Sequence, residues 1–570
     1  MQGRLKILAA LFLLAVVALV VRLFYWQIIK GRVLSYQARS QYETDTTLAA
    51  PRGNILSSDG GWLAANSEAY LVFAEVPNLK DSPKAIADKL APLFVEDISD
   101  RESLLLEIDR IYSLLTKKEI VWVPLKQKVA PEIKKNIEAM AISGIGFERQ
   151  EVRAYPEASA AAQLLGFVGK NEEGQDKGYF GLEGFYDLAL TGKPGYSVRE
   201  SDARGTPILL GSAKEVNPIS GVDLLTTIDK RVQMVLEKKL KEGIEKYGAK
   251  GGTAIVMDPT SGAILGMSSF PSYDPASYWK YGDEFFKNPA VSDTFEPGSV
   301  FKVVIMASAL DAKAVEPDTI CDICSGPVKV DKYLIETWNR KYNPGSTMTD
   351  VIVHSDNVGM TFVGEKLGAD ALYDYLKKFG IGSLTGVDLQ GEATPKLRDK
   401  GSWSTVDLAT ATFGQGIALT PIQLIKAVGT IANGGRLVTP HMVLKLQKEG
   451  WEESVAPSFG EKILSDQTIA DITAMMVEAA QYGEAKWTYQ RGFSVAGKTG
   501  TAQIPIAGHY DETKTIASFI GFSPAVEAKF IMLITLKEPQ TSQWASETAA
   551  PLWYSIAREL FPYFGIQPEN

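Results

Sequence analysis

The stretch FEPGSVFK, residues 295–302, opens the most informative part of the sequence and continues into the apolar run VFKVVIMASAL, residues 300–310. A Pro-Gly pair marks a turn, and the apolar run behind it predicts a buried helix. Because positions i and i+3 share a helix face, Ser299 and Lys302 should lie side by side. The free N–H groups at a helix N-terminus also favour developing negative charge. The spacing therefore predicts a serine nucleophile with a lysine base.

Ser-x-x-Lys alone is weak evidence for this interpretation, but two further motifs support it. A second Ser-x-x-Lys, at Ser277 and Lys280, has no apolar helix behind it, and we interpret it as coincidence. Downstream lie Ser-Asp-Asn, at residues 355–357, and Lys-Thr-Gly-Thr, at residues 498–501, inside the strand-like sequence SVAGKTGTAQI. Each motif is short and common by chance. All three in this order, one opening a buried helix and one on a strand, indicate serine acyl-transfer chemistry.

Composition excludes several other functions. A chain of 570 residues is too long for one ordinary domain, and roughly two to four are expected. A net charge of −9, without a basic stripe alternating with aromatic residues, argues against a nucleic-acid binder. The three histidines, His354, His441 and His509, show no metal-ligand spacing, and the sequence carries no phosphate-binding glycine loop. We therefore expect neither a metal nor a cofactor.

The two cysteines, Cys321 and Cys324, form a single C-x-x-C pair. This pair is half a zinc site at most; it could close as a local disulfide in an oxidising compartment, or be redox-active in a thioredoxin-like setting. The flanking sequence TICDICSGPVKV is typical of a loop and not of a strand entering a helix. A structural or incidental role is therefore favoured.

The N-terminal sequence predicts a membrane anchor. Residues 7–21 form an unbroken apolar run preceded by Arg4 and Lys6. Extension to Trp26 gives the length needed to cross a hydrocarbon core of about 30 Å, with Arg22 near enough to the outer end to reach the interface. The sequence after the run, RLFYWQIIKG, lacks a small-residue cleavage site, so we predict an uncleaved signal-anchor. Charge alone leaves its orientation open.

Residues 30–218 pair no nucleophile with a base, and we interpret them as a spacer domain. Turn signals predict a hairpin-like element at residues 50–66, and the pattern of residues 84–142 is mostly that of amphipathic helices.

The C-terminal part shows strands at both ends with helices between them, which predicts one antiparallel sheet covered by helices. Asp229 is expected to cap a helix over residues 230–247, and PTSG to join the two strands of a hairpin. Further strands are predicted at residues 493–503, 516–522 and 530–536, and a closing helix at residues 547–560.

Together these motifs resemble the class B penicillin-binding proteins, the monofunctional peptidoglycan D,D-transpeptidases, over nearly the whole chain. The motifs that carry the resemblance are RLFYWQIIKG, PRGNI with DGGWLA, RAYP, GLEGFYD, FEPGSVFK, SDNVG, FGQGIALTPIQ, ANGG and KTGTAQ. FEPGS and SDNVGM look more like the septal, division-type branch than the elongation-type branch.

The resemblance implies a membrane-anchored, multidomain protein. An α+β N-terminal pedestal would precede an α/β penicillin-binding domain similar to the serine β-lactamases, in which helices cover an antiparallel five-stranded sheet. Because murein lies outside the cytoplasmic membrane, the catalytic domain is expected on the external, periplasmic side. We expect a cytoplasmic tail at residues 1–6, a transmembrane signal-anchor at 7–28, a pedestal of the dimerisation type at 29–218 and a transpeptidase domain at 219–565.

The expected base is Lys302, since Ser299 has no plausible histidine partner. A free lysine has a pKa of about 10.4, so action near neutrality requires a decrease of roughly three units. Burial on an apolar helix and a second cation, Lys498, would both lower that pKa. The resemblance further implies that Ser355 relays the proton to the leaving amine and that Asn357 hydrogen-bonds Lys302 and the substrate amide.

The expected substrate-binding residues lie around the third motif. The resemblance implies that Lys498, Thr499 and Thr501 hold the substrate carboxylate, while Gly500, lacking a side chain, lets substrate pair along the strand edge. The N–H groups of Ser299 and Thr501 would form the oxyanion hole.

The implied reaction is a two-step acyl transfer. Ser299 attacks the D-Ala-D-Ala carbonyl of a stem peptide and releases D-Ala, and an amine of a neighbouring stem takes the acyl group. β-Lactams should acylate the same serine and remain bound. The expected partners are peptidoglycan stem peptides, β-lactam antibiotics, a SEDS-type glycosyltransferase and other division proteins.

Other functions remain open on the sequence. The same fold could serve a D,D-carboxypeptidase, a β-lactamase, or a membrane-anchored sensor or scaffold. Ser299 could be a plain helix cap and Lys302 a surface residue, although the other two motifs argue against that. We expect His354 to be core or surface, and Glu392 to be a loop residue without a water-activating role.

Overall fold

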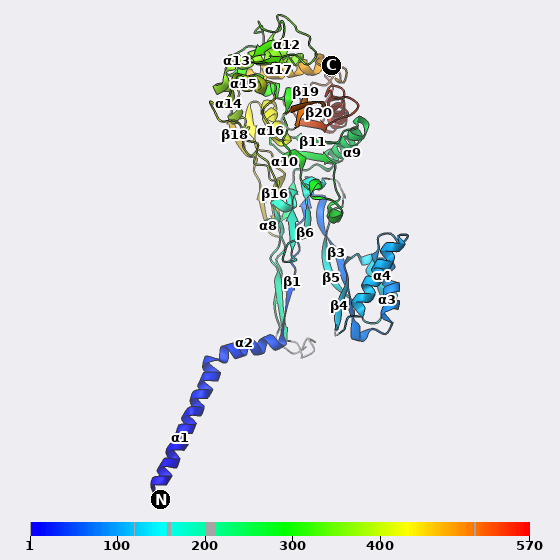
Figure 1. Ribbon diagram of the computed structural model, residues 1–570, viewed down its shortest axis with the longest axis vertical. Helices are drawn as coiled ribbons and strands as arrows, with labels where there is room; N and C mark the ends of the chain where they lie inside the picture. Colours follow the sequence, from blue (N-terminus) through cyan, green and yellow to red (C-terminus); the bar gives the residue numbers. More distant parts are fainter. Residues whose placement is uncertain (1, 119, 157–160, 201–212, 507–508, 570) are drawn as a thin grey trace. The chain divides into compact units, whose positions relative to one another are not determined.

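The computed structural model describes residues 2–118, 120–156, 161–200, 213–506 and 509–569 (Figure 1). The chain divides into two compact units, each built from two separate segments. The first unit comprises Met1–Arg52 and Thr191–Gly221; the second comprises Gly53–Leu190 and Val222–Asn570.

The N-terminal helix of the first unit is the candidate membrane anchor. Helix α1 (Gln2–Phe24) continues through a π-helical turn (Tyr25–Ile29) into α2 (Gly31–Tyr42). The span Gly3–Ile29 is strongly apolar, and its most apolar part is not buried. It is long and apolar enough to cross a membrane, and the signal-anchor expected at residues 7–28 falls within it.

The described residues of the first unit also form three strands. They are β1 (Glu43–Leu48), β8 (Gly195–Glu200) and β9 (Ala213–Val216). The strands form an antiparallel sheet in the order β1-β8-β9.

The second unit contains a seven-stranded mixed sheet. Its order is β17-β16-β10-β2-β3-β4, and β5 also pairs with β3. The predicted hairpin at residues 50–66 is present as β2 and β3, which pair antiparallel. The strands are β2 (Ile55–Leu56), β3 (Trp62–Glu75), β4 (Trp122–Val129), β5 (Ile145–Ala154), β10 (Asp223–Thr226), β16 (Val443–Lys448) and β17 (Trp451–Ser454).

Residues 84–142 are mostly helical, as expected, but the strand β4, which was not predicted, lies between two of the helices. In WVPLKQKV the buried side chains are Val123, Leu125 and Val129. The first two alternate with exposed neighbours, a period of two that the polar residues around this short strand obscure. Its apolar side chains join a core with the adjacent helices. These helices are α3 (Pro83–Phe94), α4 (Arg101–Leu115) and α5 (Pro131–Ala139).

The buried carboxylate of Asp388 joins the segment after α7 to the start of the strand β16 by hydrogen bonds. Both oxygens of Asp388, which is 8% exposed, accept hydrogen bonds: Oδ1 from Met442 N (2.6 Å), and Oδ2 from Val443 N (3.0 Å) and from the Tyr186 hydroxyl (2.8 Å). The short elements that lead to this junction are α6 (Ala162–Leu165), β6 (Phe167–Lys170), β7 (Asp176–Tyr179), α7 (Gly181–Phe185) and α8 (Asp187–Leu190).

The second unit also contains the antiparallel five-stranded sheet that was expected. Its order is β12-β11-β21-β20-β19, and every neighbouring pair is antiparallel. The PTSG hairpin is confirmed as β11 and β12, and β19, which carries the third motif, is an edge strand. The strands are β11 (Gly251–Met257), β12 (Ile264–Phe270), β19 (Ala496–Ile506), β20 (His509–Ser523) and β21 (Phe530–Lys537).

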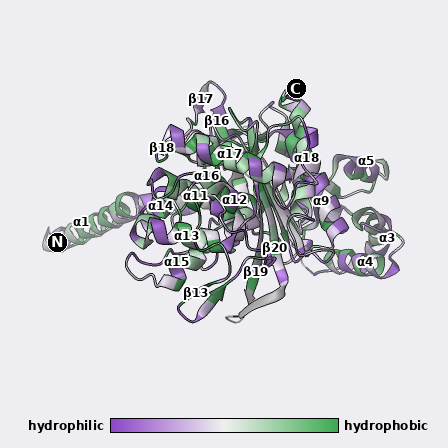
Figure 2. Cartoon of the chain, turned by 90° about the horizontal axis from the view of Figure 1, so that it is seen from above, coloured by the Kyte–Doolittle hydropathy of each residue, from purple (hydrophilic) through white to green (hydrophobic). Residues whose placement is uncertain are grey.

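Helices cover both faces of this sheet, as Figure 2 shows from above. Along β11, Ala254 and Val256 belong to one apolar core, whereas Ile255 and Met257 belong to another, because successive side chains of a strand point to opposite faces. The first core contains α9 (Lys230–Tyr247), capped by Asp229 as predicted, and the closing helix α18 (Ala549–Tyr563). The second contains α11 (Lys302–Asp311), α13 (Asn357–Leu367), α16 (Pro421–Ala432) and α17 (Asp466–Tyr482).

The unit also contains smaller elements. They are α10 (Pro289–Ser292), α12 (Met348–Val353), α14 (Ala369–Lys378), α15 (Thr405–Thr412), β13 (Val328–Val330), β14 (Tyr333–Ile335), β15 (Arg436–Val438) and β18 (Phe459–Lys462).

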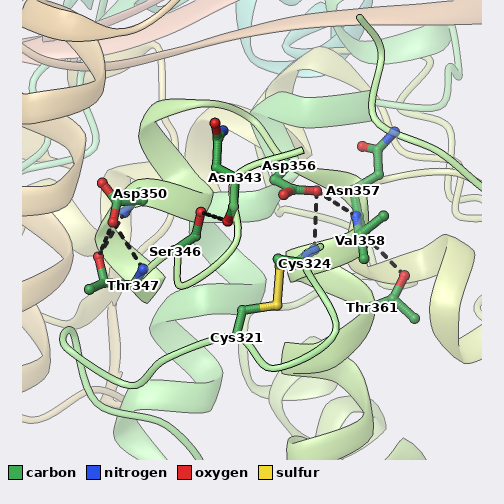
Figure 3. Close-up of a disulfide and its surroundings, with 11 residues drawn as sticks. Cys321, Cys324, Asn343, Ser346, Thr347, Asp350, Asp356, Asn357, Val358 and Thr361 are labelled. Carbon is green, nitrogen blue, oxygen red and sulfur yellow. Dashed lines mark hydrogen bonds between the residues drawn. A yellow bond between two sulfur atoms is a disulfide. The ribbon is translucent and has the colours of Figure 1, made fainter. Parts of the chain in front are cut away.

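The cysteine pair forms a local disulfide in the loop between α11 and β13 (Figure 3). Both residues are buried, Cys321 at 2% and Cys324 at 0% exposure. The backbone N–H of Cys321 donates to the carbonyl of Ser346 at 2.9 Å, immediately before the cap of α12. The disulfide thus belongs to the loop that leads toward the second motif.

We predict that Asp388→Asn destabilises the chain. An amide cannot accept all three hydrogen bonds that the carboxylate accepts, and it brings an N–H toward buried donors. We expect a loss of about 2–3 kcal/mol in the free energy of unfolding, measured by thermal or denaturant unfolding. Asp374→Asn is the control, because the ion pair of Asp374 with Lys400 is about half exposed; it should change that free energy much less than Asp388→Asn does. Equal effects of the two variants would contradict this role of Asp388.

Candidate active site

Ser299 lies on a tight turn that enters α11. The turn is a 3-10 helix, Gly298–Phe301, and the α-helix begins at Lys302. Gly298 has a φ of 59°, and its N–H donates to the carbonyl of Gly414 at 3.0 Å. A positive φ is readily adopted only by glycine, so Gly298 fixes the chain direction just before the nucleophile. The half-buried Ser299 lines a pocket together with residues of the other two motifs.

Lys302 is fully buried, with 0% exposure, and its amine reaches the second motif. Nζ donates to the carbonyl oxygen of Ser355 at 2.7 Å and to Oδ1 of Asn357 at 2.7 Å, and it lies 3.4 Å from the Ser355 hydroxyl. Burial, followed by the positive charge of Lys498, lowers the pKa of Lys302 to about 7. At that pKa a substantial fraction of the amine is neutral near pH 7 and able to accept a proton.

The Ser355 hydroxyl lies between two amines. Lys498 Nζ donates to Ser355 Oγ at 3.0 Å and to the Thr499 carbonyl at 3.1 Å. Lys498 is 3% exposed, and burial lowers its pKa as well. The arrangement brings Lys302, Ser355 and Lys498 into one hydrogen-bonded group, although 143 residues separate the last two along the chain.

Local capping explains how the second motif is held. Helix α12 begins with a capping box between Thr347 and Asp350, drawn in Figure 3, and Ser355 follows that helix with a φ of 56°. Asp356 caps the next helix, with Oδ1 accepting from the N–H groups of Val358 (2.8 Å) and Gly359 (3.2 Å). Asn357 is therefore the first residue of α13 and not its cap, which leaves its amide oxygen for Lys302.

The third motif lies on the edge strand β19, against the turn that holds Ser299. A Cβ added to Gly500 would lie 2.7 Å from Val300 N and 3.2 Å from the Pro297 carbonyl oxygen. Glycine is required here because the strand approaches the turn closely, a reason that the sequence did not reveal. Thr501 Oγ1 accepts from the N–H of Ala545 at 3.0 Å.

The pocket has a volume of about 80 Å³ and contains side chains that sequence reasoning missed. Trp338 and Trp544, whose ring centroids are 5.0 Å apart, come from loops without a recognisable motif. Phe413 and Gln415 belong to the FGQG stretch, which was noted only as part of a resemblance. The lining residues are Gly298, Ser299, Trp338, Ser355, Asn357, Phe413, Gln415, Glu484, Gly500, Thr501 and Trp544.

Other residues considered from the sequence do not line this pocket. Lys280, of the second Ser-x-x-Lys, pairs with Glu96 at 2.7 Å. His354 is exposed, and Glu392 accepts hydrogen bonds from the N–H and hydroxyl of Thr385, both at 2.6 Å. A larger hollow of about 540 Å³ lies beside α9 and contains none of the three motifs, so size does not identify the site.

Comparisons with known proteins all point to the same family. Family models match residues 252–560 as a penicillin-binding protein transpeptidase domain and residues 47–226 as a penicillin-binding protein dimerisation domain. The chain is 33% identical to stage V sporulation protein D of Bacillus subtilis, covering 96% of this chain and 84% of that protein. It is 27% identical to the probable peptidoglycan D,D-transpeptidase PenA of Neisseria meningitidis, covering 100% of this chain and 94% of the relative.

The fold is also similar to a solved structure. Penicillin-binding protein 2X from Streptococcus thermophilus superposes with a TM-score of 0.74 at 23% identity, covering 92% of this chain and 83% of that structure. At this identity the likeness concerns the fold alone.

We predict that Gly500→Ala disturbs the contact between β19 and the Ser299 turn. The added methyl group would lie 2.7 Å from a backbone nitrogen, so strand or turn must move. We expect a loss of about 1–3 kcal/mol in the free energy of unfolding. Gly326→Ala is the matched control, because nothing lies within 4 Å of a Cβ at that position. A stability equal to that of the control would show that the contact does not require glycine.

Proposed function

The chain belongs to the penicillin-binding protein transpeptidases, and we propose that it cross-links peptidoglycan stem peptides through an acyl-enzyme on Ser299. The observation that carries the proposal is that Lys302 and Lys498 converge on the hydroxyl of Ser355, which lines the same pocket as Ser299. A relative of similar length is named as a probable peptidoglycan D,D-transpeptidase, which supports the same reaction.

In the first step, Lys302 takes the proton of Ser299 as the oxygen attacks the carbonyl carbon of the penultimate D-Ala. A base with a pKa near the working pH suits this task, because it is both available and basic enough to accept the proton. The N–H groups of Ser299 and Thr501 receive the charge on the carbonyl oxygen. Ser355, held between the two amines, then passes a proton to the leaving D-Ala.

Substrate is oriented by the third motif. Lys498 and the hydroxyl group of Thr501 attract the terminal carboxylate, since a cation and a hydroxyl donor together match an anionic group. The Thr499 hydroxyl, which donates to Glu484 Oε2 before substrate binds, turns its proton to the same carboxylate. Asn357 contributes its amide, whose oxygen already binds Lys302.

In the second step an amine of a neighbouring stem attacks the ester carbon, the bond to Ser299 Oγ breaks, and that oxygen regains a proton. A β-lactam offers a similar carbonyl and carboxylate, and its ring-opened product stays on the serine.

The location and partners follow from this substrate. The α1 anchor would hold the catalytic unit on the external side of the cytoplasmic membrane, where murein is assembled. FEPGS and SDNVGM support a septal role in cell-wall synthesis. A SEDS-type glycosyltransferase, which would supply nascent glycan strands, and other division proteins are the proposed partners.

We predict that benzylpenicillin labels one serine. After incubation with the full-length chain in detergent, mass spectrometry of proteolytic fragments should place the adduct on Ser299, and Ser299→Ala should abolish it. Ser277→Ala, in the second Ser-x-x-Lys, should be labelled as fast as the unaltered chain. An adduct on any residue other than Ser299 would contradict the proposed function.

We predict that the acylation rate by benzylpenicillin rises with pH through about 7 and then levels off. The pKa of Lys302 is lowered to about 7, so the protonated form, which cannot act as a base, dominates below that pH. Asn357→Asp would place a carboxylate beside Lys302 Nζ, now 2.7 Å from Oδ1, and should raise that pKa. The midpoint of the pH profile, measured by stopped-flow or quenched labelling, should therefore move upward. An unshifted midpoint would remove Lys302 from the role of base.

A further inference from the structure

Glu484 is a charged residue of the pocket that the proposed mechanism does not use. It follows α17 directly, after Gly483 ends that helix, and it lines the same pocket as Ser299. Its Oε2 accepts from Thr499 Oγ1 at 3.0 Å, and that hydroxyl lies 3.4 Å from Lys498 Nζ. Among the described residues that line the pocket, Glu484 alone has an acidic side chain.

This carboxylate opposes the binding of the donor peptide. The donor ends in a carboxylate that Lys498 attracts, and a second negative charge nearby repels it. Asp356, another acid of this region, does not line the pocket; its Oδ1 accepts from backbone N–H groups at the start of α13, although its charge also acts on Lys302. Glu484 therefore suits something other than the acylation step.

The second substrate of a transpeptidase is a cation in water. An alkyl amine has a pKa of about 10, so the acceptor arrives as an ammonium ion. It must reach the ester on Ser299 in a pocket whose Ser355 is flanked by Lys302 and Lys498, and the charge of these lysines repels it. Burial lowers the pKa of both lysines, and the negative charge of Glu484 acts in the opposite sense on each, in keeping with its place in the same pocket.

We propose that Glu484 binds the ammonium group of the acceptor and thereby directs the acyl-enzyme toward transfer instead of hydrolysis. The inference rests on the proposed function, because it requires an acyl group on Ser299. The acceptor first loses one proton to water and becomes a neutral amine. Its nitrogen then bonds to the acyl carbon as the bond from that carbon to Ser299 Oγ breaks. The second proton passes through Lys302 or Ser355 to the serine oxygen, which restores the hydroxyl.

The test compares a charged acceptor with an uncharged one. The full-length chain in detergent is given a D-alanyl thioester donor with either Nα-acetyl-lysine amide, an ammonium at neutral pH, or hydroxylamine, which is uncharged there. The ratio of transfer product to hydrolysis product is measured for each. In Glu484→Gln the ratio with the lysine acceptor should fall about tenfold, and the ratio with hydroxylamine by less than about twofold.

Matched variants separate the charge from other effects. Glu484→Asp keeps the carboxylate on a shorter side chain and should recover part of the transfer to the lysine acceptor. Glu478→Gln removes a charge from an exposed position of the same helix α17 and should leave both ratios unchanged. Acylation of Glu484→Gln by benzylpenicillin should be at least as fast as in the unaltered chain, because a like charge has been removed, whereas a damaged pocket would slow it.

An unchanged ratio with the lysine acceptor, or an equal fall with both acceptors, would overturn the role of Glu484. These outcomes differ from failure of the proposed function. In that case the unaltered chain itself would form no adduct on Ser299.

Discussion

A lysine amine removed from water is the constraint on which the rest of the catalytic unit depends. Lys302 is completely buried at the start of α11, and an amine in that position must find acceptors or lose its proton. The Ser355 carbonyl and Asn357 Oδ1, both at 2.7 Å, supply the acceptors. Burial and Lys498 together lower the pKa toward neutrality. Near neutral pH the amine of Lys302 therefore exists in both its protonated and its neutral form, and the two acceptors can bind either form.

The fold meets this constraint by bringing three distant segments together. Helix α11 supplies Lys302, the start of α13 supplies Asn357, and the edge strand β19 supplies Lys498. Apolar cores on both faces of the five-stranded sheet fix these elements, so the amines stay close despite their mutual repulsion. Close backbone approach matters equally: a Cβ on Gly414 would lie 2.2 Å from the Gly298 carbonyl oxygen. Glycines at such contacts let the backbone segments that carry the motifs approach closely.

Sequence patterns predicted the elements whose signals are local. The α9 helix with its Asp229 cap and the PTSG hairpin were recognisable from periodicity and turn residues, and the three motifs from short spacings. Strand β4 was missed because its few buried side chains lie among polar residues. Trp338, Trp544 and Glu484 were missed for a different reason. Nothing near them in the sequence marks them, and only tertiary contacts bring them to the pocket.

Protonation links the stability of this unit to its chemistry. The pKa of Lys302 lies near 7 in the folded chain and near 10.5 in an unfolded one, so between these values the unfolded chain binds more protons. The contribution of this group to stability therefore rises with pH from about 7 to about 10.5, and below pH 7 the full penalty of a buried ammonium is present. The folded state thus favours the neutral amine, the form that can take the proton of Ser299. Burial of Lys302 costs free energy during folding. Because that burial disfavours the ammonium form, less free energy is needed to deprotonate the amine when the reaction occurs.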